Sequence, residues 1–206
     1  MNYTALAPQE TVNRTIEALK ARNIEGHFVA NGTEALDAIK QLIPKGASVH
    51  NGSSTTLIQI GAVDYLKDTD TNGWNNLHAK TLAETDPTKK AELQHAQHFA
   101  DYYLGSVHAL TEDGELVIAS ASGSQLPSIV HTAKNLIFVV STMKIMPTLD
   151  DAIKRLREHV VPLENERMKA TGAPGTNLAK MLVFDNEPVW TGRKVHIIFV
   201  NKALGF

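Results

Sequence analysis

Apolar residues recur along the chain at two characteristic spacings. In the opening segment they stand three or four positions apart, as Val12, Ile16 and Leu19 do, which predicts an amphipathic helix. Elsewhere they form short uninterrupted runs such as Leu136–Val140, the pattern of a strand covered on both faces. Helical and strand-like segments alternate, and this order indicates an α/β fold built from βαβ units. The predicted helices are residues 10–22, 35–43, 57–66, 87–100, 127–134 and 149–171, and the predicted strands are 27–30, 47–50, 102–105, 116–118, 136–140, 181–184 and 195–200.

Two segments rich in small residues follow predicted strands. Asn51–Thr56 lies between a strand and a helix, and Ala119–Ser124 precedes another helix. Asp113 and Gly114 form a strong two-residue turn signal. Residues 67–82 are rich in asparagine and fit no regular element, so we expect an excursion from the fold that acts as a lid or as a subunit contact.

Length and composition narrow the class of protein. The 206 residues, 43% of them hydrophobic, suit one domain over 1–206, in which residues 1–40 form a helical extension or a first βα unit. The formal net charge is -2, so the chain lacks the excess of basic residues that binds nucleic acid or an anionic membrane. We therefore expect a small ligand. The chain starts without a leader pattern and has no apolar run long enough to span a bilayer, which predicts a cytoplasmic protein.

The chain contains no cysteine. Disulfides, thiolate nucleophiles and cysteine-ligated zinc or iron-sulfur clusters are therefore excluded within it, and we expect no cofactor held by this chain. Any catalysis must use oxygen or nitrogen groups.

Several motifs resemble the lactate-utilisation (LUD) family in order and spacing, over roughly residues 40 to 206. They are Ile43–Val49, Asn51–Leu57, Ile60–Gly61, Ala100–Gly105, Ala109–Val117, Ser122–Gly123, Leu136–Val140 and Val195–Phe206. The resemblance implies a doubly wound, mostly parallel sheet of the type shared by ribose-phosphate isomerases and coenzyme A transferases. It also implies that two loops, around Gly52 and Gly123, meet at the carboxyl ends of strands, where open α/β sheets bind ligands.

The resemblance implies a role in the oxidation of L-lactate to pyruvate, beside a partner subunit that carries iron-sulfur clusters. Many relatives have a cysteine-rich stretch before the last strand, whereas here Gly172–Met181 has none. Part of the chain is also similar to ribose-5-phosphate isomerase, but Val107 and Leu110 stand where that enzyme has catalytic carboxylates. The base for an aldose-ketose proton transfer is thus missing, which argues against isomerase activity.

The two loops supply the predicted ligand-binding residues. Amides and hydroxyls of the first loop would converge at a helix N-terminus and attract a phosphate or carboxylate, although a capping box formed by Thr56 and Gln59 would explain part of the pattern. In the second loop glycine permits close backbone approach, and the alternative is a simple helix cap. The predicted ligand-binding residues are Asn51, Gly52, Ser53, Ser54, Thr55, Thr56, Ser122, Gly123, Ser124 and Gln125.

Three residues are candidates for catalysis. Glu112 stands where coenzyme A transferases, which the segment resembles, have a glutamate nucleophile, and the alternative is an ordinary surface acid in a turn. His50 and His108 follow strand ends, where acid-base or hydrogen-bond roles are plausible. His95 and His98 share one helix face, but we expect surface histidines there and no metal site. Arg193 and Lys194 are interpreted as flanking charges of an outer strand.

These observations favour a component of lactate utilisation that binds a small carboxylate or phosphate. Two alternatives stay open: an acyl-coenzyme A transferase-like enzyme that uses Glu112, and a non-catalytic sensor or assembly subunit. The expected partners are a small anion and an iron-sulfur subunit, with no nucleic acid and no membrane. The residues leave the oligomeric state open, a homo-oligomer included.

Overall fold

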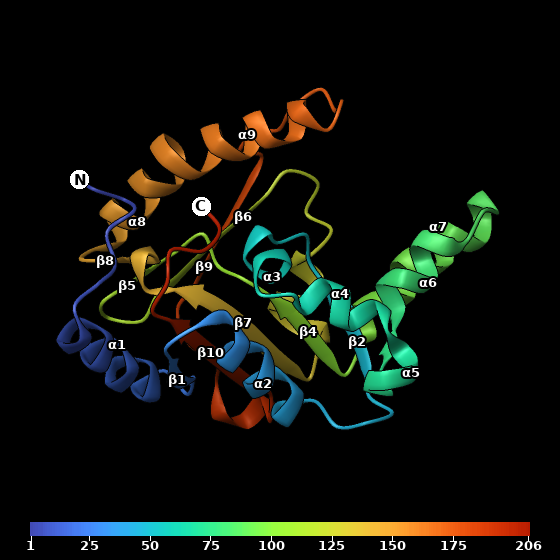
Figure 1. The fold of residues 1–206 in the computed structure, drawn as a ribbon, viewed down its shortest axis with the longest axis horizontal. Helices are drawn as coiled ribbons and strands as arrows, with labels where there is room; N and C mark the ends of the chain where they lie inside the picture. Colours follow the sequence, from blue (N-terminus) through green and yellow to red (C-terminus); the bar gives the residue numbers. More distant parts are fainter.

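The computed structural model describes residues 1–206 and contains two β-sheets (Figure 1). The larger sheet has six strands in the order β1-β10-β7-β4-β2-β3, and all its neighbours pair in parallel. Helices connect these strands, so the sheet is the mostly parallel, doubly wound sheet that the sequence predicted. Its strands are β1 (Glu25–Val29), β2 (Ser48–Asn51), β3 (Asn75–Asn76), β4 (Tyr102–Gly105), β7 (Asn135–Ser141) and β10 (Lys194–Val200).

Both faces of the main sheet are buried because alternate residues of its central strands enter different hydrophobic cores. In β7, Leu136 and Phe138 pack against α1 (Gln9–Ala21) and the second sheet, whereas Ile137 and Val139 pack on the opposite side. The opposite face is covered by α2 (Gly32–Leu42), α3 (Thr55–Gln59) and α4 (Ala62–Lys67). This two-sided burial explains the uninterrupted apolar runs of β7 and β10.

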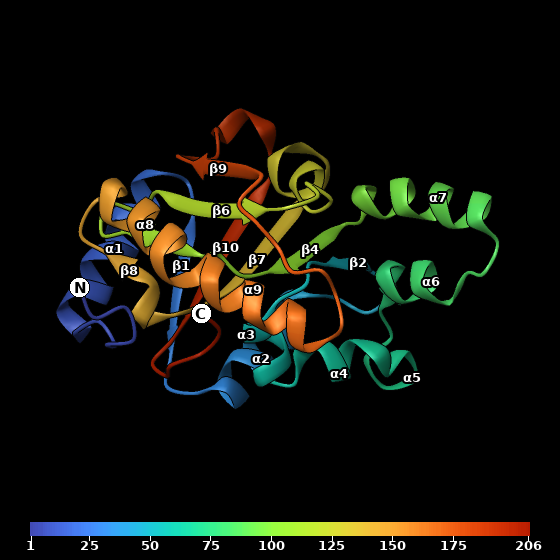
Figure 2. The ribbon, with the colours of Figure 1, turned by 90° about the horizontal axis from the view of Figure 1, so that it is seen from above.

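The second sheet has four strands in the order β8-β5-β6-β9. They are β5 (Ala109–Thr111), β6 (Leu116–Ser120), β8 (Ile145–Met146) and β9 (Lys180–Phe184). One face packs on the main sheet, and the other packs against a long helical segment formed by α8 (Leu149–Arg155), η4 (Leu156–Val160) and α9 (Val161–Ala170). In Figure 2 this helical segment crosses the front of the second sheet.

The long helical segment changes to π-helix at η4, directly before Pro162 at the start of α9. Proline has no amide hydrogen to donate to the preceding turn, and a local π-helix accommodates the missing bond. One face of this segment, with Leu156, Val160, Glu164 and Arg167, lines the pocket described below.

Residues 67–82 contain regular structure rather than an irregular excursion. They form α5 (Thr69–Asn72), β3 and the start of α6 (Leu77–Ala83), and α7 (Pro87–Ala96) follows. Trp74 is buried against Tyr65 and donates to the carbonyl of Ile43 over 3.1 Å, so it anchors the segment instead of covering a site. Figures 1 and 2 both show α6 and α7 projecting away from the two sheets.

The first forty residues form part of the main sheet. Residues of β1 pair in register with β10, and α1 and α2 flank it, so this region is a βα unit with a preceding helix. Arg193 precedes β10 and Lys194 begins it, and β10 is not an outer strand because it lies between β1 and β7. None of the helices is long and apolar enough to cross a bilayer.

Candidate functional site

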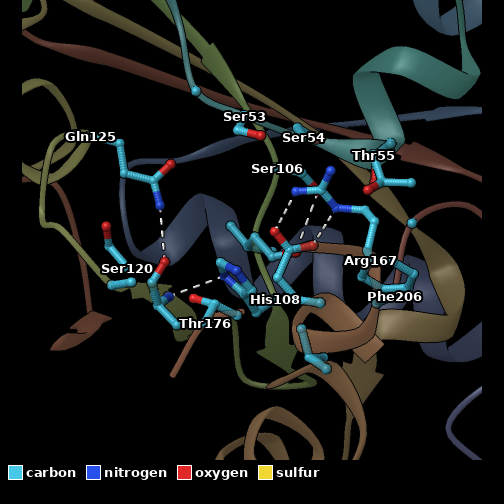
Figure 3. Close-up of a pocket in the computed structure, with 18 of the residues that line it drawn as sticks. Ser53, Ser54, Thr55, Ser106, His108, Ser120, Gln125, Arg167, Thr176 and Phe206 are labelled. Carbon is cyan, nitrogen blue, oxygen red and sulfur yellow. Dashed lines mark hydrogen bonds and ion pairs between the residues drawn. The ribbon is translucent and has the colours of Figure 1, made fainter. Parts of the chain in front are cut away.

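Three parallel strands end beside one another and open into a common pocket. The segments that follow β2, β4 and β7 are the Gly52 loop, Ser106–His108 and Thr142–Lys144. The pocket has a volume of about 520 Å³, within the range of small-molecule sites. Figure 3 shows Ser106, which follows β4, Ser120 of β6 and Arg167 of α9 around this space. The sequence-predicted residues that line it are His50, Asn51, Gly52, Ser53, Ser54, Thr55, Thr56, His108, Ser122, Ser124 and Gln125.

The second predicted loop is hydrogen-bonded to the main sheet through Tyr103 of β4. The Tyr103 hydroxyl donates to Gln125 Oε1 over 2.9 Å, and Gln125 Nε2 donates to the carbonyl of Ala119 over 2.9 Å. Burial raises the pKa of the Tyr103 hydroxyl, so it stays protonated and donating. A Cβ atom at position 52 would overlap this hydroxyl oxygen, which explains why the first loop has glycine there. Gln125 therefore ties the second loop to β4, and its Nε2 keeps a second hydrogen for a ligand in the pocket that Gln125 lines.

The hydroxyls of the first loop have different tasks. Ser54 Oγ accepts from the amide of Leu57 over 3.3 Å and caps α3, so the N-cap is Ser54 and the capping box predicted at Thr56 and Gln59 does not form. Thr56 Oγ1 accepts from Lys144. Ser53 and Thr55 line the pocket without a hydrogen-bond partner in the chain. Because α3 has only five residues, its helix dipole contributes little, and the positive charge of the pocket must come from elsewhere.

Lys144 supplies that charge. Its side chain is 3% exposed, and Nζ lies 3.2 Å from Thr56 Oγ1, from Ser106 Oγ and from the carbonyl oxygen of Val107. None of the ion pairs in the structure involves Lys144, so the ammonium group has no acidic partner. Burial, and secondarily the charge of Arg155, lowers the pKa of Lys144 from 10.5 to about 7.

Arg155 is a second buried cation behind the pocket wall. It is fully buried and donates to the main-chain oxygens of His108, Phe206 and Tyr3, while its Nε has no partner. Burial lowers the pKa of Arg155 to about 10, so it remains charged at neutral pH. Its charge adds to the positive potential at Lys144.

His108 lines the pocket in a defined tautomer. Its Nδ1 accepts from the amide of Ala119 over 3.1 Å, which leaves the proton on Nε2. Burial, followed by the charges of Lys144 and Arg155, lowers the pKa of His108 to about 3. A neutral imidazole of this kind serves as a hydrogen-bond donor and does not act as a proton shuttle near pH 7.

His50 belongs to a cluster of three histidines at another side of the pocket. Its Nδ1 lies 3.0 Å from Ser128 Oγ, and the rings of His78 and His98 lie 6.2 and 5.4 Å from its own. Burial and the two neighbouring histidines lower the pKa of His50 to about 3. His78 also lines the pocket, and its Nδ1 is buried without a hydrogen-bond partner.

Arg167 and Glu164 lie on the α9 side of the pocket. They form a bidentate pair, with Arg167 Nε 2.7 Å from Glu164 Oε2 and Nη2 2.6 Å from Oε1. This pairing raises the pKa of Arg167 and uses the face of the guanidinium that would otherwise bind a ligand carboxylate. Figure 3 shows Arg167 extending into the same space as Ser53 and Thr55.

Two predicted site residues lie outside the pocket lining. Gly123 stands in the second loop with φ of 88°, where it shapes the turn, but only its neighbours line the cavity. Glu112 lies in the turn between β5 and β6, 2.8 Å from Arg14 Nη2 of α1. The geometry therefore separates Glu112 from the residues around Lys144 and gives it a surface ion pair.

Sequence reasoning missed Lys144, Arg167, Glu164 and His78. Lys144 had a usable signal, because Ser141–Lys144 is a polar segment directly after the predicted central strand, in the same position as the Gly52 loop after β2. Arg167 and Glu164 had none, because the pattern around Pro162 does not show which face of the helix meets the sheets. The charged residues of the pocket lie far apart in the sequence and meet only through the packing of α9 on the sheets.

Comparisons with known proteins agree with this architecture. Residues 12–200 match the family model described as the LUD domain. A crystal structure of a DUF162 family protein from Deinococcus radiodurans superposes with a TM-score of 0.58 at 12% identity, covering 96% of this chain and 100% of that one. At this identity the likeness concerns the fold alone. No curated protein sequence matches the chain significantly.

Proposed function

The chain belongs to the LUD domain family, and on that premise we propose that it binds a small carboxylate or phosphate in the pocket around Lys144 as a component of lactate utilisation. Membership of the family supports a role related to lactate utilisation. The ligand is our inference from the pocket. The same proposal assigns iron-sulfur chemistry to a partner subunit, because this chain has no cysteine to ligate a cluster.

The observation that carries the proposal is the unpaired charge of Lys144. A shift of its pKa from 10.5 to about 7 corresponds to a cost of about 5 kcal/mol for keeping the buried ammonium group charged. Buried charges are normally paired, and a cation without an acid in a pocket is ready to accept an anion. A carboxylate or phosphate next to Nζ would supply the counter-charge and raise the pKa of Lys144 again.

Neutral donors around Lys144 support the same ligand class. The hydroxyls of Ser53 and Thr55 are unpaired, and the assigned tautomer of His108 leaves its Nε2 hydrogen as a donor. While Lys144 binds one oxygen of the anion, these neutral donors would bind its other oxygens. They could also bind a hydroxyl or keto oxygen on the carbon next to a carboxylate. A short 2-hydroxy or 2-oxo acid offers this combination of groups.

The proposal is tested by ligand titration of the wild type and of two variants. Lactate, pyruvate and phosphate are titrated by isothermal calorimetry and by thermal shift into wild type, Lys144→Met and Lys202→Met, in which Lys202 is exposed. We expect one of the anions to bind the wild type and Lys202→Met equally, and Lys144→Met about 10–100-fold more weakly, since a charge-assisted hydrogen bond is worth about 1.5–3 kcal/mol.

Two results would contradict the proposal. Either none of these anions binds the wild type, or Lys144→Met binds an anion as tightly as the wild type does. Far-ultraviolet circular dichroism of each variant separates loss of binding from loss of fold. Co-purification with an iron-sulfur protein tests the partner assignment independently of these titrations.

A further inference from the structure

Three side chains with metal-binding atoms meet at the edge of the main sheet, outside the pocket. β1 is an edge strand and pairs in parallel with β10, as Figure 1 shows at the blue and red strands. Glu25 stands opposite His196 in the register of this pair, and His27 follows Glu25 on the same face of β1. Gly26 between them faces Ile16 of α1, so Glu25 and His27 project from the other face.

The ligand atoms of these residues lie at metal-binding separations. His27 Nε2 is 3.3 Å from His196 Nδ1, His196 Nδ1 is 3.4 Å from Glu25 Oε2, and His27 Nε2 is 4.0 Å from Glu25 Oε2. Ligand atoms about 2.1 Å from a tetrahedral ion are separated by roughly 3.4 Å. Two of the three distances have this value. The third involves the exposed carboxylate of Glu25, which can move closer without disturbing the core.

We propose that Glu25, His27 and His196 form a binding site for a divalent transition metal ion, with zinc as the best fit, at the β1–β10 edge. Two imidazole nitrogens and one carboxylate oxygen are ligands that zinc prefers, and water completes the tetrahedron. Magnesium is disfavoured because it prefers oxygen ligands in an octahedral arrangement.

The site is separate from the proposed anion pocket. None of its three residues lines that pocket. The ion would connect the edge strand β1, which has only one neighbouring strand, to β10 in the sheet interior. Its expected effect is therefore on stability of the fold rather than on ligand binding around Lys144.

The local sequence gives no hint of this site. His27 and His196 are 169 residues apart, and only the parallel pairing of β1 with β10 brings their nitrogens together. Without a metal, the same contact is a single imidazole–imidazole hydrogen bond with a nearby carboxylate. These two states differ in metal stoichiometry, which can be measured directly.

The experiment uses tag-free, full-length protein dialysed against zinc at pH 7.5, with metal content measured by mass spectrometry and affinity measured by competition with a chromophoric chelator. The variants are His27→Gln and Glu25→Gln, both at side chains that are not buried, and the control is His95→Gln on the exposed surface of α7. Cobalt substitution adds a visible spectrum that identifies tetrahedral coordination.

We expect the wild type and His95→Gln to bind about one zinc ion per chain. His27→Gln and Glu25→Gln should each lower the affinity for zinc at least about tenfold. Mutation of a residue that only hydrogen-bonds to a metal ligand already lowers metal affinity about 10–100-fold. Zinc at about 100 times its dissociation constant should raise the Tm of the wild type by roughly 5–10 °C, and magnesium should not.

The proposal is overturned if the wild type retains no stoichiometric zinc, or if His27→Gln binds zinc as tightly as the wild type. The contact is then only a hydrogen bond between two histidines. Far-ultraviolet circular dichroism and the Tm of each variant without metal serve as the check that it is folded.

Discussion

Replacing Lys144 by methionine should change how the stability of the protein depends on pH. Methionine has a similar length and no charge, so it fills the same space without burying an ammonium group. The folded-state pKa of Lys144 is about 7, below the ordinary value of 10.5 expected in the unfolded chain. Between these two pH values the unfolded chain binds more protons than the folded protein, so the free energy of unfolding rises with pH in that window.

The size of the effect follows from the two pKa values. Lys144 destabilises the fold most at low pH, where it is protonated in both states, and its penalty disappears as pH rises toward 10.5. Between pH 6 and pH 9 the linkage relation gives a gain of about 3 kcal/mol in the wild type that Lys144→Met cannot show. Groups common to both proteins cancel in this difference.

Urea unfolding at pH 6, 7, 8 and 9, in buffers that contain no lactate, pyruvate or phosphate, measures the effect. The difference in free energy of unfolding between Lys144→Met and wild type should shrink by about 3 kcal/mol from pH 6 to pH 9. Lys202→Met provides the control with an exposed lysine. If the wild type and Lys144→Met give parallel curves over this range, Lys144 is not a desolvated cation and the argument for the anion site fails.

Three further predictions concern other residues of the fold and site. Gly52→Ala should destabilise the protein by about 1–3 kcal/mol in urea unfolding and weaken anion binding, because the new methyl group displaces the Tyr103 hydroxyl from Gln125. Arg193→Met should cost about 3–5 kcal/mol in the same assay, because Arg193 pairs with the buried Glu187 over 3.0 Å and donates to four carbonyls around η2 (Ser128–Thr132), whereas the exposed Arg157→Met should change little. Glu112→Gln should leave anion binding unchanged in calorimetry. A transferase with Glu112 as its nucleophile would instead lose thioester turnover completely in that variant.

Much of the fold could be predicted from the sequence because its signals are local. The apolar run at Leu136–Val140 became the interior strand β7, and Asp86 with Pro87 begins α7 as their residue types require. Boundaries moved where two signals competed. Asn31 caps α2, so this helix begins at Gly32 and not at residue 35 as predicted. Gly61, at φ of 76°, divides the predicted helix 57–66 into α3 and α4.

Features that depend on distant residues could not be predicted in this way. The sequence does not show that α6 and α7 would project from the body, or that Arg193 would be buried with Glu187, because both depend on packing partners far away in the chain. The two loops around the pocket were predicted from their composition. The cation they surround was not, because an isolated lysine in a sequence is normally a surface residue.

The charges around the pocket distinguish between its two proposed ligand classes. Lys144 is the one cationic side chain in the lining without an acidic partner, since Arg167 is held by Glu164 and both lining histidines with lowered pKa values are neutral near pH 7. A monocarboxylate balances a single charge, whereas a phosphate dianion needs a second cation. The wild type should therefore prefer lactate or pyruvate to phosphate.

Glu164→Gln frees Arg167 and should strengthen phosphate binding by about tenfold, with a smaller change for lactate. Tenfold corresponds to about 1.4 kcal/mol, the effect of one additional charge-assisted contact. Calorimetry of both ligands with both proteins tests this, and an unchanged affinity for phosphate in Glu164→Gln would show that Arg167 does not reach the bound anion.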